Sequence, residues 1–178
     1  EAPKEAVATE GFAGLVVEPK TAVQVAADIA GKTASAEAVT QAYLDRIAAV
    51  DDAGPMLNAV LAINPKALED AKALDAAGAA RGLLHGVPIL LKDNIDTLDM
   101  PTTAGSLALA NNMTGRDSPL VARLRAAGAV ILGKTNLSEW ANFRSNGSSS
   151  GWSAVGGLTK NPHVLDRNTC GSSAGSGA

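Results

Sequence analysis

The chain of 178 residues is long enough to enclose an apolar core, and its hydrophobic content of 46% is too high for a disordered protein. Its 15 basic and 18 acidic side chains form no basic stripe, which argues against nucleic acid as a partner. One cysteine and two histidines are too few for a disulfide framework or a His/Cys metal site, and no apolar run is long enough to span a membrane.

Three helices and one strand are predicted in the N-terminal part of the chain. Residues 1–18 are mixed in composition and are expected to be extended or poorly ordered. A first helix is expected over 21–30, and a second over 35–50 begins at a serine N-cap and carries one apolar stripe. A short apolar strand at 57–63 precedes a third helix over 65–78, with a proline at its first position.

The middle of the chain has the pattern of a strand–helix–strand unit. An apolar run at 87–91 predicts a buried strand that ends at Lys92, with Pro88 at its start. A helix capped by a serine follows over 118–127, and a second apolar strand over 129–132. The inward face of that helix is expected to carry Leu120, Val121 and Leu124. This order predicts an α/β fold, with helices packed on a mostly parallel or mixed sheet that is incomplete at its C-terminal end.

Lys92 stands at the end of an apolar strand, and such a position favours an uncharged amine. Five apolar residues lead directly to it, so burial is expected to desolvate the amine and lower its pKa. An amine that acts as a general base needs a pKa near the working pH, about 7–8. The alternative interpretation is a strand-end lysine that pairs with Asp93 or extends into solvent.

Two later segments are rich in glycine and serine. The stretch at 145–157 lacks periodicity and is long for a connection, which favours a loop at a binding site. In the stretch at 171–177, glycines beside serines let the backbone approach a ligand closely. A flexible turn or a phosphate-binding loop are alternatives there, although the Gly-Lys-Ser/Thr of a P-loop is absent. A nucleophile elbow would use Ser173 and need His85 or His163 as its partner.

Taken together, these segments resemble the amidase signature family, from about residue 35 to residue 178. Each matching string is short, but together they follow the order and spacing of the family. The strings lie at 90–94, 103–106, 117–121, 128–136 and 171–177. The whole chain, residues 1–178, is therefore interpreted as the N-terminal part of a single amidase domain.

The resemblance implies a Ser–cis-Ser–Lys triad that hydrolyses a carboxylic amide to an acid and ammonia or an amine through an acyl-enzyme. Lys92 matches the family's base, and Ser172 matches the bridging serine, which follows a cis peptide bond from Gly171 in the family. Gly171 and Ser173 would support the loop or contact substrate. The family's nucleophilic serine lies in a later loop, beyond residue 178, so the chain alone is expected to be inactive. No metal and no organic cofactor is implied.

A further string narrows the resemblance. Residues 135–143 and 150–153 resemble exported bacterial amidases of the peptide-amidase type, although Trp140 and Phe143 are also expected to pack in the core. The chain starts at Glu1 rather than at Met, which favours a periplasmic or secreted protein over a cytoplasmic one. The expected partners are a small-molecule or peptide amide substrate and the remaining C-terminal part of the same protein.

Two rival functions stay open at this point. One is an amidotransferase A-type subunit, which would use the same triad to release ammonia for glutaminyl-tRNA formation and would need partner subunits. The other is a fragment or pseudoenzyme that binds without catalysis.

Overall fold

The computed structural model describes residues 20–178, so the expectation for residues 1–18 lies outside the described residues. The helices are α1 (Ala22–Ala30), α2 (Ala36–Val50), α3 (Ala67–Ala76), α4 (Pro119–Ala126) and α5 (Ala174–Gly177), with 3-10 turns η1 (Leu107–Leu109) and η2 (Glu139–Asn142). The strands are β1 (Val60–Ile63), β2 (Pro88–Lys92), β3 (Val130–Thr135), β4 (Trp152–Ser153) and β5 (Gly157–Leu158). Within this range, none of the helices combines the length and the apolar character that a membrane crossing requires.

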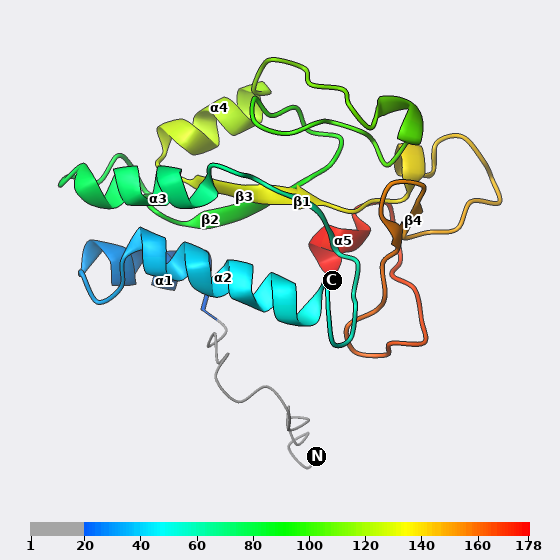
Figure 1. Ribbon diagram of the computed structural model, residues 1–178, viewed down its shortest axis with the longest axis horizontal. Helices are drawn as coiled ribbons and strands as arrows, with labels where there is room; N and C mark the ends of the chain where they lie inside the picture. Colours follow the sequence, from blue (N-terminus) through cyan, green and yellow to red (C-terminus); the bar gives the residue numbers. More distant parts are fainter. Residues whose placement is uncertain (1–19) are drawn as a thin grey trace, which may run out of the picture.

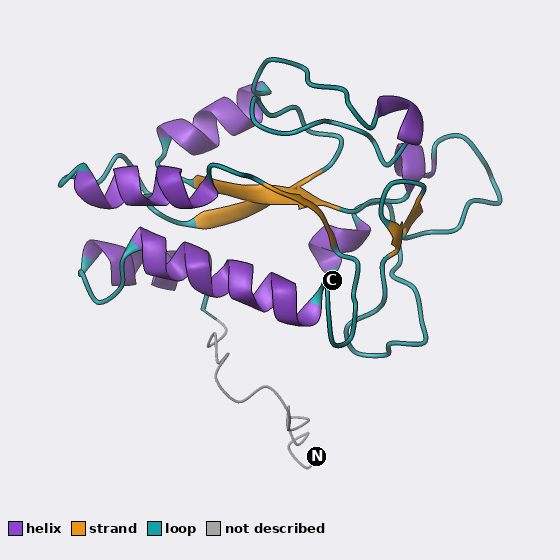
Figure 2. Cartoon of the chain, in the orientation of Figure 1, coloured by secondary structure: helices purple, strands orange, loops and turns teal. Residues whose placement is uncertain are grey.

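The three longer strands form a mixed sheet with helices on both faces (Figure 1). The strand order is β1-β3-β2, with β2 parallel and β1 antiparallel to β3. The β2–α4–β3 segment is therefore the predicted strand–helix–strand unit, and the α/β fold class is confirmed. The remaining two strands, β4 and β5, make a separate antiparallel pair (Figure 2).

Apolar side chains on the two faces of the sheet form two clusters. Buried residues of α1, α2 and α3 pack on one face against Val130 and Leu132 of β3. On the opposite face, Ile131 packs with Val121 of α4. Alternation along β3 directs successive side chains to opposite faces, so this one strand links both clusters and is buried throughout.

Serine caps set the starts of α2 and α4 as predicted, and Thr21, which was expected to be the first residue of a helix, is the cap of α1. Thr21 forms a capping box at α1, Ser35 accepts a hydrogen bond from an α2 backbone N–H, and Ser118 does the same at α4. Other boundaries differ from the prediction. Strand β3 continues to Thr135, beyond the predicted end at residue 132, and α3 ends at Ala76 rather than near residue 78. The α3 helix begins at Ala67, because the Asn64 side chain accepts the backbone N–H of Lys66 and makes a turn there.

The first strand is also shorter than predicted. The carboxylate of Asp51 accepts the backbone N–H groups of Ala59 and Val60, at 2.6 and 3.0 Å, which removes these donors from strand pairing. Asn58 has a left-handed φ of 53°, which interrupts the extended backbone just before them. Strand β1 therefore begins at Val60 rather than at residue 57.

Three apolar side chains lie elsewhere than predicted. Leu120 is 44% exposed, because the one-sided packing of α4 buries Val121 and leaves its neighbour facing solvent. Phe143 is 94% exposed, and Trp140 has a φ of 50°, so the two residues do not share a regular helical turn. The expectation that Trp140 and Phe143 pack together in the core is wrong.

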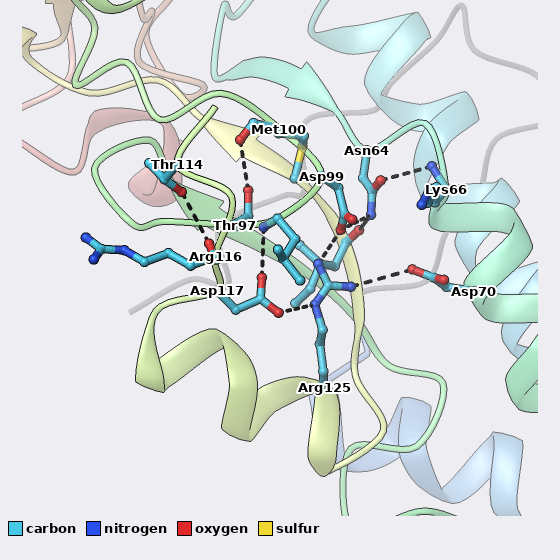
Figure 3. A network of polar contacts seen from close by, with 12 residues as sticks. Asn64, Lys66, Asp70, Thr97, Asp99, Met100, Thr114, Arg116, Asp117 and Arg125 are labelled. Carbon is cyan, nitrogen blue, oxygen red and sulfur yellow. Dashed lines mark hydrogen bonds and ion pairs between the residues drawn. The ribbon is translucent and has the colours of Figure 1, made fainter. Parts of the chain in front are cut away.

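One arginine joins three segments on the α4 side of the sheet (Figure 3). The Arg125 guanidinium lies 2.9 Å from the Asp117 carboxylate and 3.6 Å from that of Asp70, and it also pairs with Asp99. Desolvation raises the pKa of Asp70 above its usual range, against the opposing effect of Arg125. The cluster ties α3 and α4 to the long connection after β2.

Candidate active site

Lys92 and Ser172, 80 positions apart in the sequence, meet at the C-terminal end of β2. The Lys92 Nζ lies 2.7 Å from the Ser172 Oγ, a distance at the short end of the range for a hydrogen bond. Both side chains are partly buried. Strand β2 ends at Lys92 as predicted, and its pairing with Thr135 of β3 fixes the backbone from which the lysine side chain extends.

The Lys92 amine has the electrostatic character expected of a base. Desolvation by burial lowers its pKa from the ordinary value of 10.5. Because the unfolded chain then binds more protons between the lowered value and 10.5, the contribution of this group to stability rises with pH across that window. At pH below the window, the cost of burying a charged amine is present in full.

Asp93 does not pair with Lys92, so that alternative interpretation is wrong. Its carboxylate instead lies 2.9 Å from the Nζ of Lys134, and the two side chains are almost fully buried. Asp93 also accepts the backbone N–H and the hydroxyl of Thr103, while Lys134 donates to the carbonyl of Pro101. The negative charge of Asp93, next to Lys92 in the sequence, is therefore balanced by Lys134. The sequence signal for this pair was a charged residue close to each of two apolar runs: Asp93 directly follows β2, and Lys134 lies near the end of β3.

The loop that carries Ser172 is held by the last residue of β3 and by the residue that follows it. The hydroxyls of Thr135 and Ser176 are 2.9 Å apart, and the Gly175 N–H donates to the carbonyl of Asn136 at 2.9 Å. A Cβ at Gly175 would lie 2.0 Å from the carbonyl oxygen of Ala59, so only glycine fits there. The glycine requirement at Gly175 thus arises from close packing of the loop on the backbone just before β1.

The peptide bond between Gly171 and Ser172 is trans, as are all peptide bonds in the described range, which contradicts the expected cis geometry. The trans form is favoured by about 3–4 kcal/mol for a bond that does not precede proline. Gly171 has a φ of +80°, a conformation that glycine adopts at little cost. This turn brings the Ser172 hydroxyl to Lys92 without a cis bond.

Ser173 is exposed and precedes α5 without a side-chain capping bond. The histidines required for a nucleophile elbow lie elsewhere: the His85 Nδ1 accepts the backbone N–H of Arg81, and His163 is exposed in a turn. Among residues 20–178, neither histidine forms a hydrogen bond with Ser173. The geometry therefore brings together Lys92 and Ser172 only.

A surface cavity of about 390 Å³ lies beside the Gly/Ser-rich segment at 145–157. Its lining includes the indole rings of Trp140 and Trp152, together with Glu139 and Arg144. The Glu139 carboxylate accepts the backbone N–H of Ala154 at 2.9 Å, which ties the two sides of the loop together. A cavity with aromatic walls and both charge signs suits a ligand with an apolar part and a polar end.

The lowered pKa of Lys92 can be tested on the chain itself. We expect competitive acylation of its lysines, followed by mass spectrometry across a pH series, to give a reaction midpoint for Lys92 below 10.5 in the folded chain. The same residue in urea is the control, and its midpoint should rise once burial is lost. Identical midpoints in the folded and unfolded chain would contradict the effect of burial.

Comparisons with known proteins identify relatives over most of the described range. The family described as Amidase matches residues 38–178. A peptide amidase from Stenotrophomonas maltophilia is 51% identical with a TM-score of 0.87, and the match covers 91% of this chain. A probable amidase of Arabidopsis thaliana is 46% identical over 82% of this chain, and the A-type subunit of a glutamyl-tRNA(Gln) amidotransferase from Acidothermus cellulolyticus is 48% identical over 89%.

These relatives are about three times as long as the matched region. The match covers 34% of the peptide amidase, 29% of the Arabidopsis protein and 31% of the amidotransferase subunit. The family match therefore includes the three-stranded sheet and the positions of Lys92 and Ser172, and two thirds of each relative have no counterpart among these 178 residues.

Proposed function

The chain belongs to the Amidase family, and on that premise we propose that it supplies the general base and the bridging serine of an amide hydrolase. The observation that carries the proposal is the 2.7 Å contact between the Lys92 Nζ and the Ser172 Oγ. Desolvation lowers the pKa of Lys92, which increases the fraction of neutral amine able to accept a proton.

The proposed chemistry moves one proton through this contact. Neutral Lys92 takes the proton of the Ser172 hydroxyl while Ser172 takes that of a nucleophilic serine, whose oxygen then attacks the amide carbonyl. The proton returns by the same path to the leaving nitrogen as the C–N bond breaks, giving an acyl-enzyme and ammonia or an amine. Water, activated in the same way, releases the acid and restores the serine.

The nucleophile is proposed to come from residues outside these 178. Among residues 20–178, the Ser172 hydroxyl contacts Lys92 and no second serine hydroxyl, and the relatives are about three times as long. The backbone donors that stabilise the oxyanion would come from the same outside region. One such donor is worth about 10²–10³ in rate, so the chain alone should show no turnover.

Two substrate classes follow from the relatives. The identity to a peptide amidase is 51%, and the cavity between Trp140 and Trp152 suits a peptide carrying a C-terminal amide. The identity to an amidotransferase A-type subunit is 48%, which favours glutamine as a second candidate substrate, with partner subunits that receive the ammonia.

Ammonia release by the full-length gene product distinguishes these candidates. We expect release from a C-terminally amidated dipeptide, and little release from free glutamine with or without glutamyl-tRNA. Release from glutamine that depends on added partner subunits would favour the amidotransferase function instead. No release from either substrate, in a protein that still binds the amidated dipeptide, would identify a non-catalytic member of the family.

A further inference from the structure

Ser138 is a fully buried serine between β3 and η2. It lies against the Gly/Ser-rich loop at 171–177 that carries Ser172, which is called the catalytic loop below. Its hydroxyl donates to the carbonyl of Gly171 at 3.0 Å, and its backbone N–H donates to the carbonyl of Ser172 at 3.1 Å. Both carbonyls of the Gly171–Ser172 dipeptide are thus bound by one residue. The direction of the Ser172 side chain depends on these two contacts.

The same hydroxyl also reaches the opposite loop. It accepts the backbone N–H of Gly151 at 2.8 Å, and Gly151 immediately precedes Trp152 in the wall of the 390 Å³ cavity. Gly151 has a φ of +82°, and a Cβ there would lie 2.6 Å from the Thr169 side-chain oxygen, so its position is narrowly defined. Ser138 therefore connects the backbone of the cavity wall to the backbone of the catalytic loop.

We propose that Ser138 is a positioning residue that holds the Ser172 hydroxyl within hydrogen-bonding distance of Lys92. The inference rests on the proposed function, because Ser138 does not reach the reacting atoms itself. A proton relay needs its members at heavy-atom distances of about 2.6–3.2 Å, and a displacement of about 1 Å can cost about 10²-fold in rate. The loss of the Ser138 hydroxyl leaves the Gly171 carbonyl and the Gly151 N–H without their partner, so the loop can shift by such an amount.

Thr97 provides the control. It is also fully buried, and its hydroxyl donates to the carbonyl of Met100 at 3.3 Å. Among the described residues, this hydroxyl bonds neither the segment at 145–157 nor the loop at 171–177. A comparison of Ser138→Ala with Thr97→Val therefore separates the loss of a buried hydroxyl from the loss of a contact to the loop at 171–177.

The test is steady-state hydrolysis by the full-length gene product of whichever amide, the amidated dipeptide or glutamine, releases ammonia. We expect Ser138→Ala to lower kcat by about 10- to 100-fold with KM within about twofold, and Thr97→Val to change kcat by less than about twofold. Both variants should lose some thermal stability, because each removes a hydrogen-bonded hydroxyl from the interior. Ser138→Thr, which keeps a hydroxyl, should recover most of the lost kcat.

Other outcomes overturn the positioning role. Equal losses of kcat in Ser138→Ala and Thr97→Val would attribute the effect to packing, and a raised KM with unchanged kcat would place Ser138 in substrate binding. If Ser138→Ala does not fold, Ser138→Thr decides the question. A folded Ser138→Thr variant with kcat lowered tenfold or more would refute the positioning role, whereas a kcat near that of the parent protein would support it. If Lys92→Ala abolishes hydrolysis but Ser138→Ala does not impair it, only this inference fails; unchanged hydrolysis in Lys92→Ala refutes the proposed function itself.

Discussion

Lys92→Ala in the full-length gene product should lower kcat for amide hydrolysis by about 10³-fold or more. The change removes the group proposed to accept the proton from Ser172, at the 2.7 Å contact. General-base catalysis contributes about 10²–10⁴-fold to the rate. When residues act as one proton relay, removal of one of them abolishes the rate contribution of the whole relay. The measurement is steady-state ammonia release from the amidated dipeptide, with circular dichroism to verify folding.

Two companion variants make this experiment specific. Lys92→Arg keeps a long cationic side chain that cannot lose its proton near neutral pH, so it should be as inactive as the alanine variant if the amine acts as a base. Lys160 is the control, since its Nζ also donates a hydrogen bond, at 2.9 Å to the carbonyl of Pro55 and away from Ser172. Lys160→Ala should keep kcat within about twofold. Substantial activity in Lys92→Arg would show that charge, and not proton transfer, is what the position provides.

The central contact was predictable because its two parts have strong local signals. An apolar run that ends in lysine predicts a buried strand and a desolvated amine, and the structure has β2 ending at Lys92. The glycine-rich loop around Ser172 matched the family's motif at the family's distance from that lysine. The starts of α2 and α4 were predicted for a similar reason, because a capping side chain bonds within its own first turn.

Features that depend on contacts distant in sequence could not be predicted in the same way. The antiparallel pairing of β1 with β3 joins segments about 70 positions apart, and no local pattern encodes the direction of the partner strand. The exposure of Phe143 depends on the left-handed backbone of the two residues at 140–141. The role of Ser138 becomes visible only once the loops at 151 and 171 lie on either side of it.

The trans bond at Gly171–Ser172 illustrates the limit of inference by resemblance. The family implied a cis bond at this position, together with a triad in which Ser172 bridges to Lys92. The structure has the proximity with a trans bond, because the positive φ of Gly171 and the two contacts from Ser138 direct the loop. Spatial proximity was the more robust part of the expectation, since several backbone conformations can deliver a flexible hydroxyl to the same amine.

The buried pair of Asp93 and Lys134 should give the largest effect on stability. Lys134→Met leaves a carboxylate that is 1% exposed without its cation, and such a loss costs about 3–5 kcal/mol in the free energy of unfolding. Asp93→Asn should cost a similar amount by leaving the Lys134 amine, which is 0% exposed, without its anion. Urea-induced unfolding of the full-length gene product, with comparable m-values for all variants, measures the difference.

The double variant tests whether the pair, and not either side chain alone, accounts for these losses. With Asp93→Asn and Lys134→Met combined, neither position carries a charge, and the new amide oxygen could still accept the N–H of Thr103. The combination should therefore recover at least half of the summed single losses. Lys160→Met, at a lysine that binds only a backbone carbonyl, should cost less than about 1 kcal/mol. Strict additivity of the two single changes would mean that the charges are not coupled. The backbone at Lys92, next to Asp93, would then be held mainly by its strand pairing and by the Thr103 contacts.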